Sequence, residues 1–97
     1  MDGHEGWLWI LKRVKISLIG RPGCHLCEDA HAVISQVISQ VGQEDIDFEE
    51  LSLLEDPNLM AKYSEEIPVI LINGLVHDFL RVDPDRLVAA IAIARSR

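Results

Sequence analysis

Two cysteines stand out in this chain of 97 residues, because only two other residues separate them. Cys24 and Cys27 lie in the segment RPGCHLCEDA, and the sequence contains no further cysteine. Thiols at this spacing either exchange a disulfide or bind a metal ion. Structural disulfides are rare in the cytoplasm, where we expect this protein to reside. The pair therefore indicates redox or metal chemistry rather than a purely structural bond.

A helix that positions the cysteines is predicted directly after them. Cys24 precedes a run of apolar residues at helical spacing, and Gly42 ends that run. Cys24 thus falls at a helix N-terminus, where unpaired backbone amides and the helix dipole favour a thiolate. Cys27 follows about one turn later on the same face, close enough to close a disulfide. The apolar run consists of Ala30, Val33, Ile34, Val37, Ile38 and Val41.

Charged neighbours would act on a Cys24 thiolate with both signs. Arg21 and His25 are cations that would stabilise it, whereas Glu28 and Asp29 oppose it while suiting the first helical turn. Two plainer interpretations stay open. His25 is equally consistent with a solvent-facing loop residue, and Arg21 with a solvated charge.

Strands and helices alternate along the rest of the chain. A strand is expected over residues 14–20, VKISLIG, and the sequence RPG ends it. A second strand is expected over residues 46–53. Asp56 followed by Pro57 is the pattern of a helix cap with proline at the first helical position, so a short helix should run to about residue 64.

A hairpin and a last helix complete the predicted elements. Pro68 precedes the strand-like run VILI, and Asn-Gly at 73–74 is a strong signal for a two-residue turn before a strand over residues 75–80. Asp-Pro at 83–84 starts the last helix. The order predicts an α/β domain in which a βαβ unit, with parallel strands, is followed by a helix, a β-hairpin and a C-terminal helix. The hairpin completes a four-stranded mixed sheet.

The cysteine segment and two later segments resemble a known family. RPGCHLCEDA, followed by EDP and then EEIPVILING, is similar to the glutaredoxin-like proteins of the thioredoxin superfamily over about residues 14–95. The resemblance implies a thioredoxin-like fold and a thiol-disulfide oxidoreductase, with Cys24 as the nucleophile and Cys27 as the resolving thiol. It also implies that Pro68 is a cis-proline packed beside the disulfide.

Residues near these three are expected to support the active site. Arg21, Pro22 and Gly23 precede the first cysteine, His25 lies between the two cysteines, and Ile67 precedes the proline. Arg21 stands where glutaredoxins carry a basic residue three positions before the first cysteine. One element of a glutathione site is therefore present.

Two departures from the family pattern concern glutathione, the tripeptide thiol that glutaredoxins use. The dipeptide between the cysteines is His25-Leu26 instead of Pro-Tyr, and DFLRVD at residues 78–83 replaces a glycine pair followed by an acidic residue. We therefore expect weakened or absent glutathione recognition. The expected partners are protein or small-molecule disulfides and a thiol reductant that the sequence does not identify, with no bound cofactor other than the Cys24–Cys27 disulfide.

Two other classes of function stay open at this point. Cys24, Cys27 and His31 together form a possible zinc-binding set, but a structural zinc site takes four ligands, and His4 and His77 are isolated in the sequence. An iron-sulfur cluster would also need ligands from a partner or from glutathione. We therefore expect no metal. The second class is an interaction domain that keeps the fold without catalysis.

Composition narrows the partners further. Sixteen acidic against nine basic residues give a net charge of −7, and no basic run can neutralise a row of phosphates, so nucleic acid is not an expected partner.

With 48% apolar residues, a single domain over residues 14–97 can bury a core without disulfide staples. Residues 1–13 are interpreted as a peripheral N-terminal extension. Its apolar stretch at 7–11 is too short to cross a bilayer and lacks a signal-peptide pattern, so we expect a cytoplasmic monomer with no membrane contact.

Overall fold

The computed structural model describes residues 14–96, and these form the elements that the sequence predicts, with one short 3-10 helix in addition. The predicted extension at residues 1–13, with its apolar stretch, lies outside the described residues. The elements in chain order are β1 (Val14–Gly20), α2 (His25–Val41), β2 (Ile46–Ser52), the 3-10 helix η2 (Leu53–Glu55), α3 (Pro57–Tyr63), β3 (Val69–Ile72), β4 (Leu75–Phe79) and α4 (Pro84–Arg95).

The strands form one mixed sheet in the order β2-β1-β3-β4. β1 and β2 run parallel, with Gly20 opposite Ser52, so their carboxyl ends meet at one edge of the sheet. β3 is antiparallel to both β1 and β4. The turn between β3 and β4 contains Asn73 and Gly74 with φ of 51° and 86°, the positive values that a two-residue hairpin turn requires. The predicted α/β topology is confirmed.

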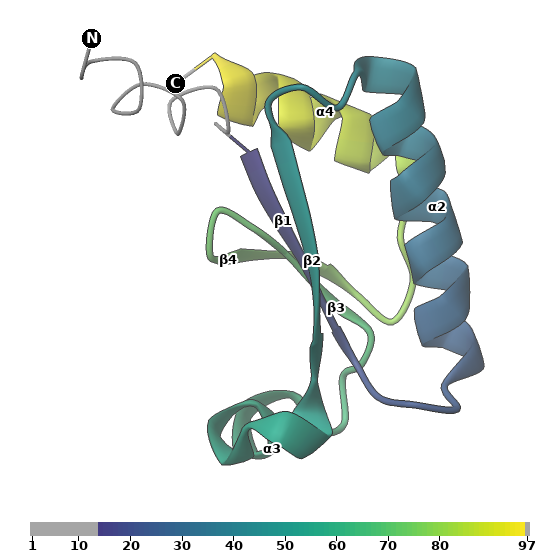
Figure 1. Ribbon diagram of the computed structural model, residues 1–97, viewed down its shortest axis with the longest axis vertical. Coiled ribbons are helices and arrows are strands. Elements are labelled where there is room, and N and C mark those ends of the chain that lie inside the picture. Colours follow the sequence, from purple (N-terminus) through teal and green to yellow (C-terminus); the bar gives the residue numbers. More distant parts are fainter. Residues whose placement is uncertain (1–13, 97) are drawn as a thin grey trace, which may run out of the picture.

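Helices cover both faces of the sheet, because β1 is apolar on both sides. Ile16 packs with Ile34 of α2 and Leu87 of α4 in the main core. Ile19 faces the other way and packs with Tyr63 of α3 in a second, smaller cluster. In Figure 1, α2 runs along the sheet, α4 crosses near one end, and α3 lies at the other end, where β2 finishes.

Two strands end one residue earlier than predicted. β2 stops at Ser52, whose side chain accepts a hydrogen bond from the amide of Leu54 and so caps η2, which takes up Leu53. β4 stops at Phe79 because Leu80 has a φ of 69°, outside the conformation of a strand. In both places the backbone leaves the strand conformation, although the next residue is still an apolar one that the sequence pattern assigned to the strand.

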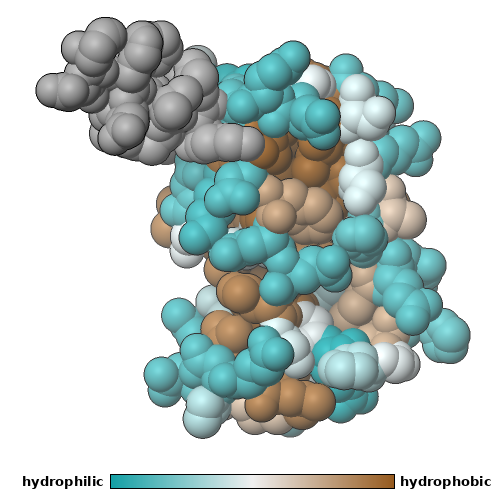
Figure 2. Space-filling model, in the orientation of Figure 1, coloured by the Kyte–Doolittle hydropathy of each residue, from teal (hydrophilic) through white to brown (hydrophobic). Residues whose placement is uncertain are grey.

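The surface carries apolar as well as charged side chains. Leu75 and Val76 of β4 and Ile93 of α4 are exposed, Leu75 to 71%. Figure 2 shows apolar residues at the surface between hydrophilic ones on the face in view. Along residues 14–96, no helix combines the length and apolarity needed to cross a membrane.

Arg95 ties the end of α4 to the end of α2. Its guanidinium donates two hydrogen bonds to the carboxylate of Asp45, at 2.8 and 2.7 Å. It also donates to the carbonyl oxygens of Val41 and Gly42, at 3.0 and 2.8 Å. The hydrogen bond to Asp45 is the main reason why the pKa of Arg95 is raised. Carbonyls at a helix end have no partner within the helix, so one helix here caps another.

Replacing Arg95 with alanine is expected to lower the free energy of unfolding by about 1–2 kcal/mol, because several charge-assisted hydrogen bonds are lost from a partly exposed site. Denaturant unfolding measures the change. Arg86→Ala is the matched control, since its contact with Asp78 is a single one at 3.4 Å with the guanidinium largely exposed. That variant should lose less than about 0.5 kcal/mol, and equal losses in both would contradict the capping role.

Candidate functional site

A tight turn carries the chain from the end of β1 to the first cysteine. Gly23 has a φ of 78°, and proline followed by a glycine with positive φ is typical of a type II turn. A side chain at Gly23 would strain this backbone even though no heavy atom lies within 4 Å of where its Cβ would be. The turn places Cys24 at the start of α2, as the sequence predicts.

Cys24 is the N-cap residue of α2. Its backbone is extended, with φ −97° and ψ 111°, and its sulfur accepts a hydrogen bond from the amide of Cys27 at 3.1 Å. Serine, threonine or aspartate oxygens usually occupy such a position. An amide N–H directed at the sulfur, together with the helix dipole, favours the thiolate over the thiol when the cysteine is reduced.

Cys24 and Cys27 are joined by a disulfide, with their Cα atoms 5.2 Å apart. The two cysteines differ in burial. Cys24 is half-buried, whereas Cys27 is only 8% exposed. An incoming reagent therefore meets Cys24 first, which agrees with the order of roles that the family resemblance implies.

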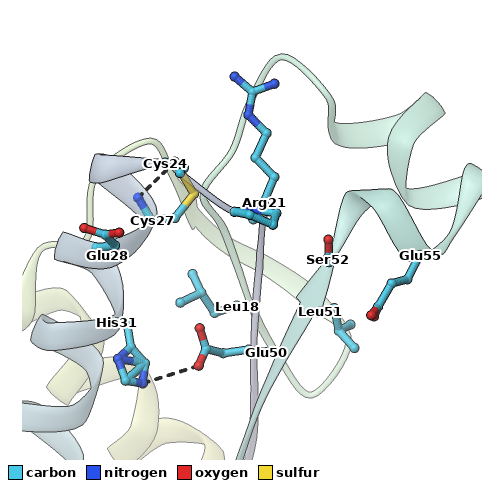
Figure 3. A pocket seen from close by; sticks show the side chains of 13 residues that line it. Leu18, Arg21, Cys24, Cys27, Glu28, His31, Glu50, Leu51, Ser52 and Glu55 are labelled. Atoms are coloured by element: carbon cyan, nitrogen blue, oxygen red, sulfur yellow. Dashed lines mark hydrogen bonds and ion pairs between the residues drawn. A yellow bond between two sulfur atoms is a disulfide. The ribbon is translucent and has the colours of Figure 1, made fainter.

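A groove of about 460 Å³ opens beside the disulfide. Its two walls come from segments far apart in the sequence, the β1–α2 loop with the start of α2 and the end of β2 with η2 (Figure 3). They meet because β1 and β2 are parallel, so that both carboxyl ends lie at one edge of the sheet. The lining residues are Leu18, Gly20, Arg21, Pro22, Gly23, Cys24, Cys27, Glu28, His31, Glu50, Leu51, Ser52 and Glu55.

The predicted support residues divide into two groups. Arg21, Pro22 and Gly23 line the groove together with both cysteines. His25 does not line it. Its side chain is 96% exposed, and its Nδ1 lies 3.7 Å from a carboxylate oxygen of Glu28. That arrangement agrees with the plainer interpretation of His25 as a surface residue.

Ile67 and Pro68 lie outside the lining of the groove, although they are at the same end of the sheet. The Ile67–Pro68 peptide bond is cis, and Pro68 is buried. Val69, the next residue, pairs with Ile19, next to Gly20. The carbonyl of Pro68 accepts a hydrogen bond from the amide of Leu80 at 2.7 Å. A place for Pro68 directly beside the disulfide stays a prediction.

His31, the third member of the possible zinc set, has other partners. Its Nε2 lies 3.4 Å from a carboxylate oxygen of Glu50, and its ring stacks on Phe48 with centroids 5.5 Å apart. Within residues 14–96, no group of three or more His, Cys, Asp or Glu side chains is arranged to hold a metal ion. His4 lies outside the described residues.

Two features of the site were missed in the sequence. One is Gly20, because a Cβ built on it would lie 2.8 Å from the sulfur of Cys27. The other is the second wall of the groove, with Glu50 and Glu55. The predicted parallel pairing was the signal for that wall, since it places the end of the second strand beside the cysteine loop.

Comparison with known proteins agrees with this geometry. A family model described as a glutaredoxin-like domain (DUF836) matches residues 15–92. The uncharacterized protein Rv0508 of Mycobacterium tuberculosis is 30% identical over 84 residues, which cover 84% of this chain and 87% of that protein.

Solved structures extend the comparison to the whole fold. Target protein XcR50 from X. campestris is 25% identical, with a TM-score of 0.64 over 80% of this chain and 96% of that one. Chloroplastic thioredoxin z is 12% identical, with a TM-score of 0.71 over 99% of this chain and 90% of that one. At 12% identity the likeness concerns the fold alone, and it confirms the predicted thioredoxin-like fold.

Proposed function

The chain belongs to the family of glutaredoxin-like domains (DUF836), and on that basis we propose that it is a thiol-disulfide oxidoreductase that acts on protein or small-molecule disulfides. The observation that carries the proposal is the placement of Cys24. Its sulfur caps α2, accepts an amide hydrogen bond, is bonded to the buried Cys27 and lines an open groove.

The proposed reaction starts from the reduced pair. The Cys24 thiolate attacks one sulfur of a substrate disulfide, so that a mixed disulfide forms and the other substrate sulfur leaves as a thiolate. Cys27 then loses its proton and attacks the sulfur of Cys24. The second substrate thiolate leaves, and the Cys24–Cys27 disulfide remains. Two electrons have passed from the protein to the substrate, and the reverse sequence oxidises a substrate dithiol.

Burial of Cys27 suits the second of these steps. A shielded thiol is inaccessible to most substrates in solution, yet it lies within one helical turn of the sulfur that it must attack. The amide N–H at the sulfur of Cys24 would stabilise the attacking thiolate. In the reverse direction it would stabilise the same thiolate when the second substrate thiol displaces Cys24 from the mixed disulfide. Both steps therefore need only the two cysteines and the start of α2.

Intact-mass spectrometry with a reaction assay tests the proposal. Mild oxidant should remove two hydrogens, about 2 Da, and dithiothreitol should restore them. The reduced protein should then reduce hydroxyethyl disulfide, a small neutral disulfide, with one protein disulfide formed for each substrate disulfide consumed. Two thiols that stay free at every potential tested would overturn the proposal. A disulfide that forms but never exchanges would favour the alternative of a non-catalytic interaction domain.

Weak glutathione recognition forms part of the proposal. Support comes from the segment that replaces the glycine pair, where Phe79 and Leu80 have exposed apolar side chains. Glycine amides approach an anion closely because no Cβ stands in the way, and bulk at this segment opposes such an approach. Arg21 lines the groove and remains as one basic anchor, and Arg81 is a second candidate partner for a carboxylate.

We expect the affinity for glutathione to be at least about tenfold lower than in a protein with the full site, because one or two charge-assisted hydrogen bonds are missing. Titration with S-methylglutathione, which binds without forming a disulfide, measures the affinity through backbone amide shifts. Shifts that stay far from saturation at millimolar ligand agree with the expectation. Tight, saturable binding with shifts at residues 78–83 would contradict it.

A further inference from the structure

The groove beside the disulfide is acidic. Three carboxylates line it, from Glu28 on α2, Glu50 on β2 and Glu55 on η2, whereas its basic lining residues are Arg21 and His31. Figure 3 shows that the side chain of Arg21 extends away from Glu50 and Glu55. The charges that face the groove itself are therefore mainly negative.

Little in the described part of the chain neutralises these carboxylates. Glu28 and Glu50 each lie near a histidine nitrogen, at 3.7 and 3.4 Å, and a histidine offsets a carboxylate only while it is protonated. For Glu55, no ion pair or hydrogen bond with another residue of the range 14–96 involves its side chain, and Figure 3 shows its carboxylate directed toward Leu51 and the groove. At mildly alkaline pH, where thiols react fastest, the field at the groove is then negative.

We infer that this groove selects disulfides that carry positive charge near the reacting sulfurs, such as a cysteine flanked by lysine or arginine in a polypeptide. Negative potential in a cleft raises the local concentration of cations and lowers that of anions. A substrate with carboxylates near its sulfurs, including glutathione disulfide, would be repelled as it approaches Cys24. The inference rests on the proposed function, and the exchange is the same two-electron reaction with a charged substrate.

Three small disulfides that differ in charge test the inference. Cystamine carries two ammonium groups, hydroxyethyl disulfide is neutral, and dithiodipropionate carries two carboxylates. The rate constant for oxidation of the pre-reduced protein is measured with each disulfide at about pH 8 and low salt. It is then divided by the rate constant for the reaction of the same disulfide with dithiothreitol. The corrected rate constant no longer depends on how reactive each disulfide is by itself. We expect the corrected rate constant for cystamine to exceed that for dithiodipropionate by about tenfold or more. In about 1 M KCl this ratio should fall toward one, because salt screens the charges.

Two double variants distinguish the effect of the groove carboxylates from the effect of the net charge of the protein. Glu50→Gln combined with Glu55→Gln should lower the corrected ratio at least about threefold. Glu44→Gln combined with Asp47→Asn removes the same charge where the chain enters β2, away from the groove, and should leave the ratio unchanged. An equal fall in both double variants, or none in the groove variant, would overturn the inference.

The result with the neutral disulfide shows whether the proposed function is wrong or only the charge selection. If hydroxyethyl disulfide is not reduced at all, the proposed oxidoreductase function fails and the inference fails with it. If all three disulfides react at equal corrected rates, the oxidoreductase stands and the charge selection by Glu50 and Glu55 is wrong. A corrected preference for dithiodipropionate would likewise overturn it, and would point to Arg21 as the dominant charge.

Discussion

Cys24→Ser is expected to abolish thiol-disulfide exchange, whereas Cys27→Ser should stop at a mixed disulfide with its substrate. Cys24 is the less buried of the two cysteines, and its sulfur accepts the amide hydrogen bond that stabilises a thiolate. A serine hydroxyl cannot attack a disulfide under these conditions, so the rate should fall by about 10³-fold or more. Without Cys27, no internal thiol resolves the intermediate, and the substrate half stays attached.

Mass spectrometry after mixing each variant with hydroxyethyl disulfide distinguishes the two outcomes. Cys27→Ser should gain one hydroxyethylthio group on Cys24, and Cys24→Ser should remain unmodified over the same time. Alkylation by iodoacetamide adds a second measurement, since Cys24 should react at lower pH than Cys27. Similar rates for the two thiols, or a mixed disulfide on Cys27, would contradict the assigned roles.

Cys24→Ser is expected to leave the fold intact because serine is a favoured N-cap residue. Its oxygen can accept the hydrogen bond from the amide of Cys27 that the sulfur accepts now. Cys27→Ser places a hydroxyl in a buried position, so Cys27→Ala is the matched second variant. Circular dichroism and unfolding of all three variants, compared with the reduced wild-type protein, check that each one is folded.

Local sequence patterns were sufficient to predict most of the fold. The cap residues Asp56 and Asp83 each accept amide hydrogen bonds at the start of the helices that they were expected to begin. The turn at Asn73 also has the expected backbone conformation. These signals act within a few residues, so no knowledge of distant contacts is needed to interpret them.

Features that depend on distant contacts were the ones the sequence analysis missed. The hydrogen bonds from Arg95 to Asp45 join residues fifty positions apart, and no local sequence pattern around either residue predicts them. In the sequence, Glu50 falls within the second expected strand and Glu55 within the segment EDP, and neither position indicates that the side chain lies near the cysteines. Their place opposite the cysteines depends on the register of β1 and β2, which pairs Gly20 with Ser52. The charge of the second wall therefore depends on topology, whereas the reactive atoms and the charges next to them come from a local motif.

Gly20 shows how close the contact between the sheet and the disulfide is. A Cβ built on Gly20 would lie 2.8 Å from the sulfur of Cys27, closer than real Cβ atoms come, and 3.1 Å from its Cβ, which is tighter than most real contacts. In the oxidised protein this sulfur is bonded to Cys24 and has little freedom to move away. In the reduced protein the Cys27 side chain can rotate about its Cα–Cβ bond. An alanine at Gly20 should therefore cost more in the disulfide form than in the dithiol form.

Gly20→Ala is accordingly expected to make the disulfide easier to reduce. Overpacking by one methyl group costs about 1–3 kcal/mol. If most of that cost is confined to the oxidised form, the reduction potential rises by about 20–60 mV, since about 30 mV corresponds to 1.4 kcal/mol for two electrons. Equilibration with dithiothreitol redox buffers measures the potential.

Gly74→Ala is the control. Gly74 has a φ of 86°, so an alanine strains the backbone there, but nothing lies within 4 Å of its Cβ position. It lies in the hairpin turn, far from the cysteines. It should lower stability without moving the potential, and a Gly20→Ala potential that is unchanged or more negative would show that the contact does not act on the disulfide.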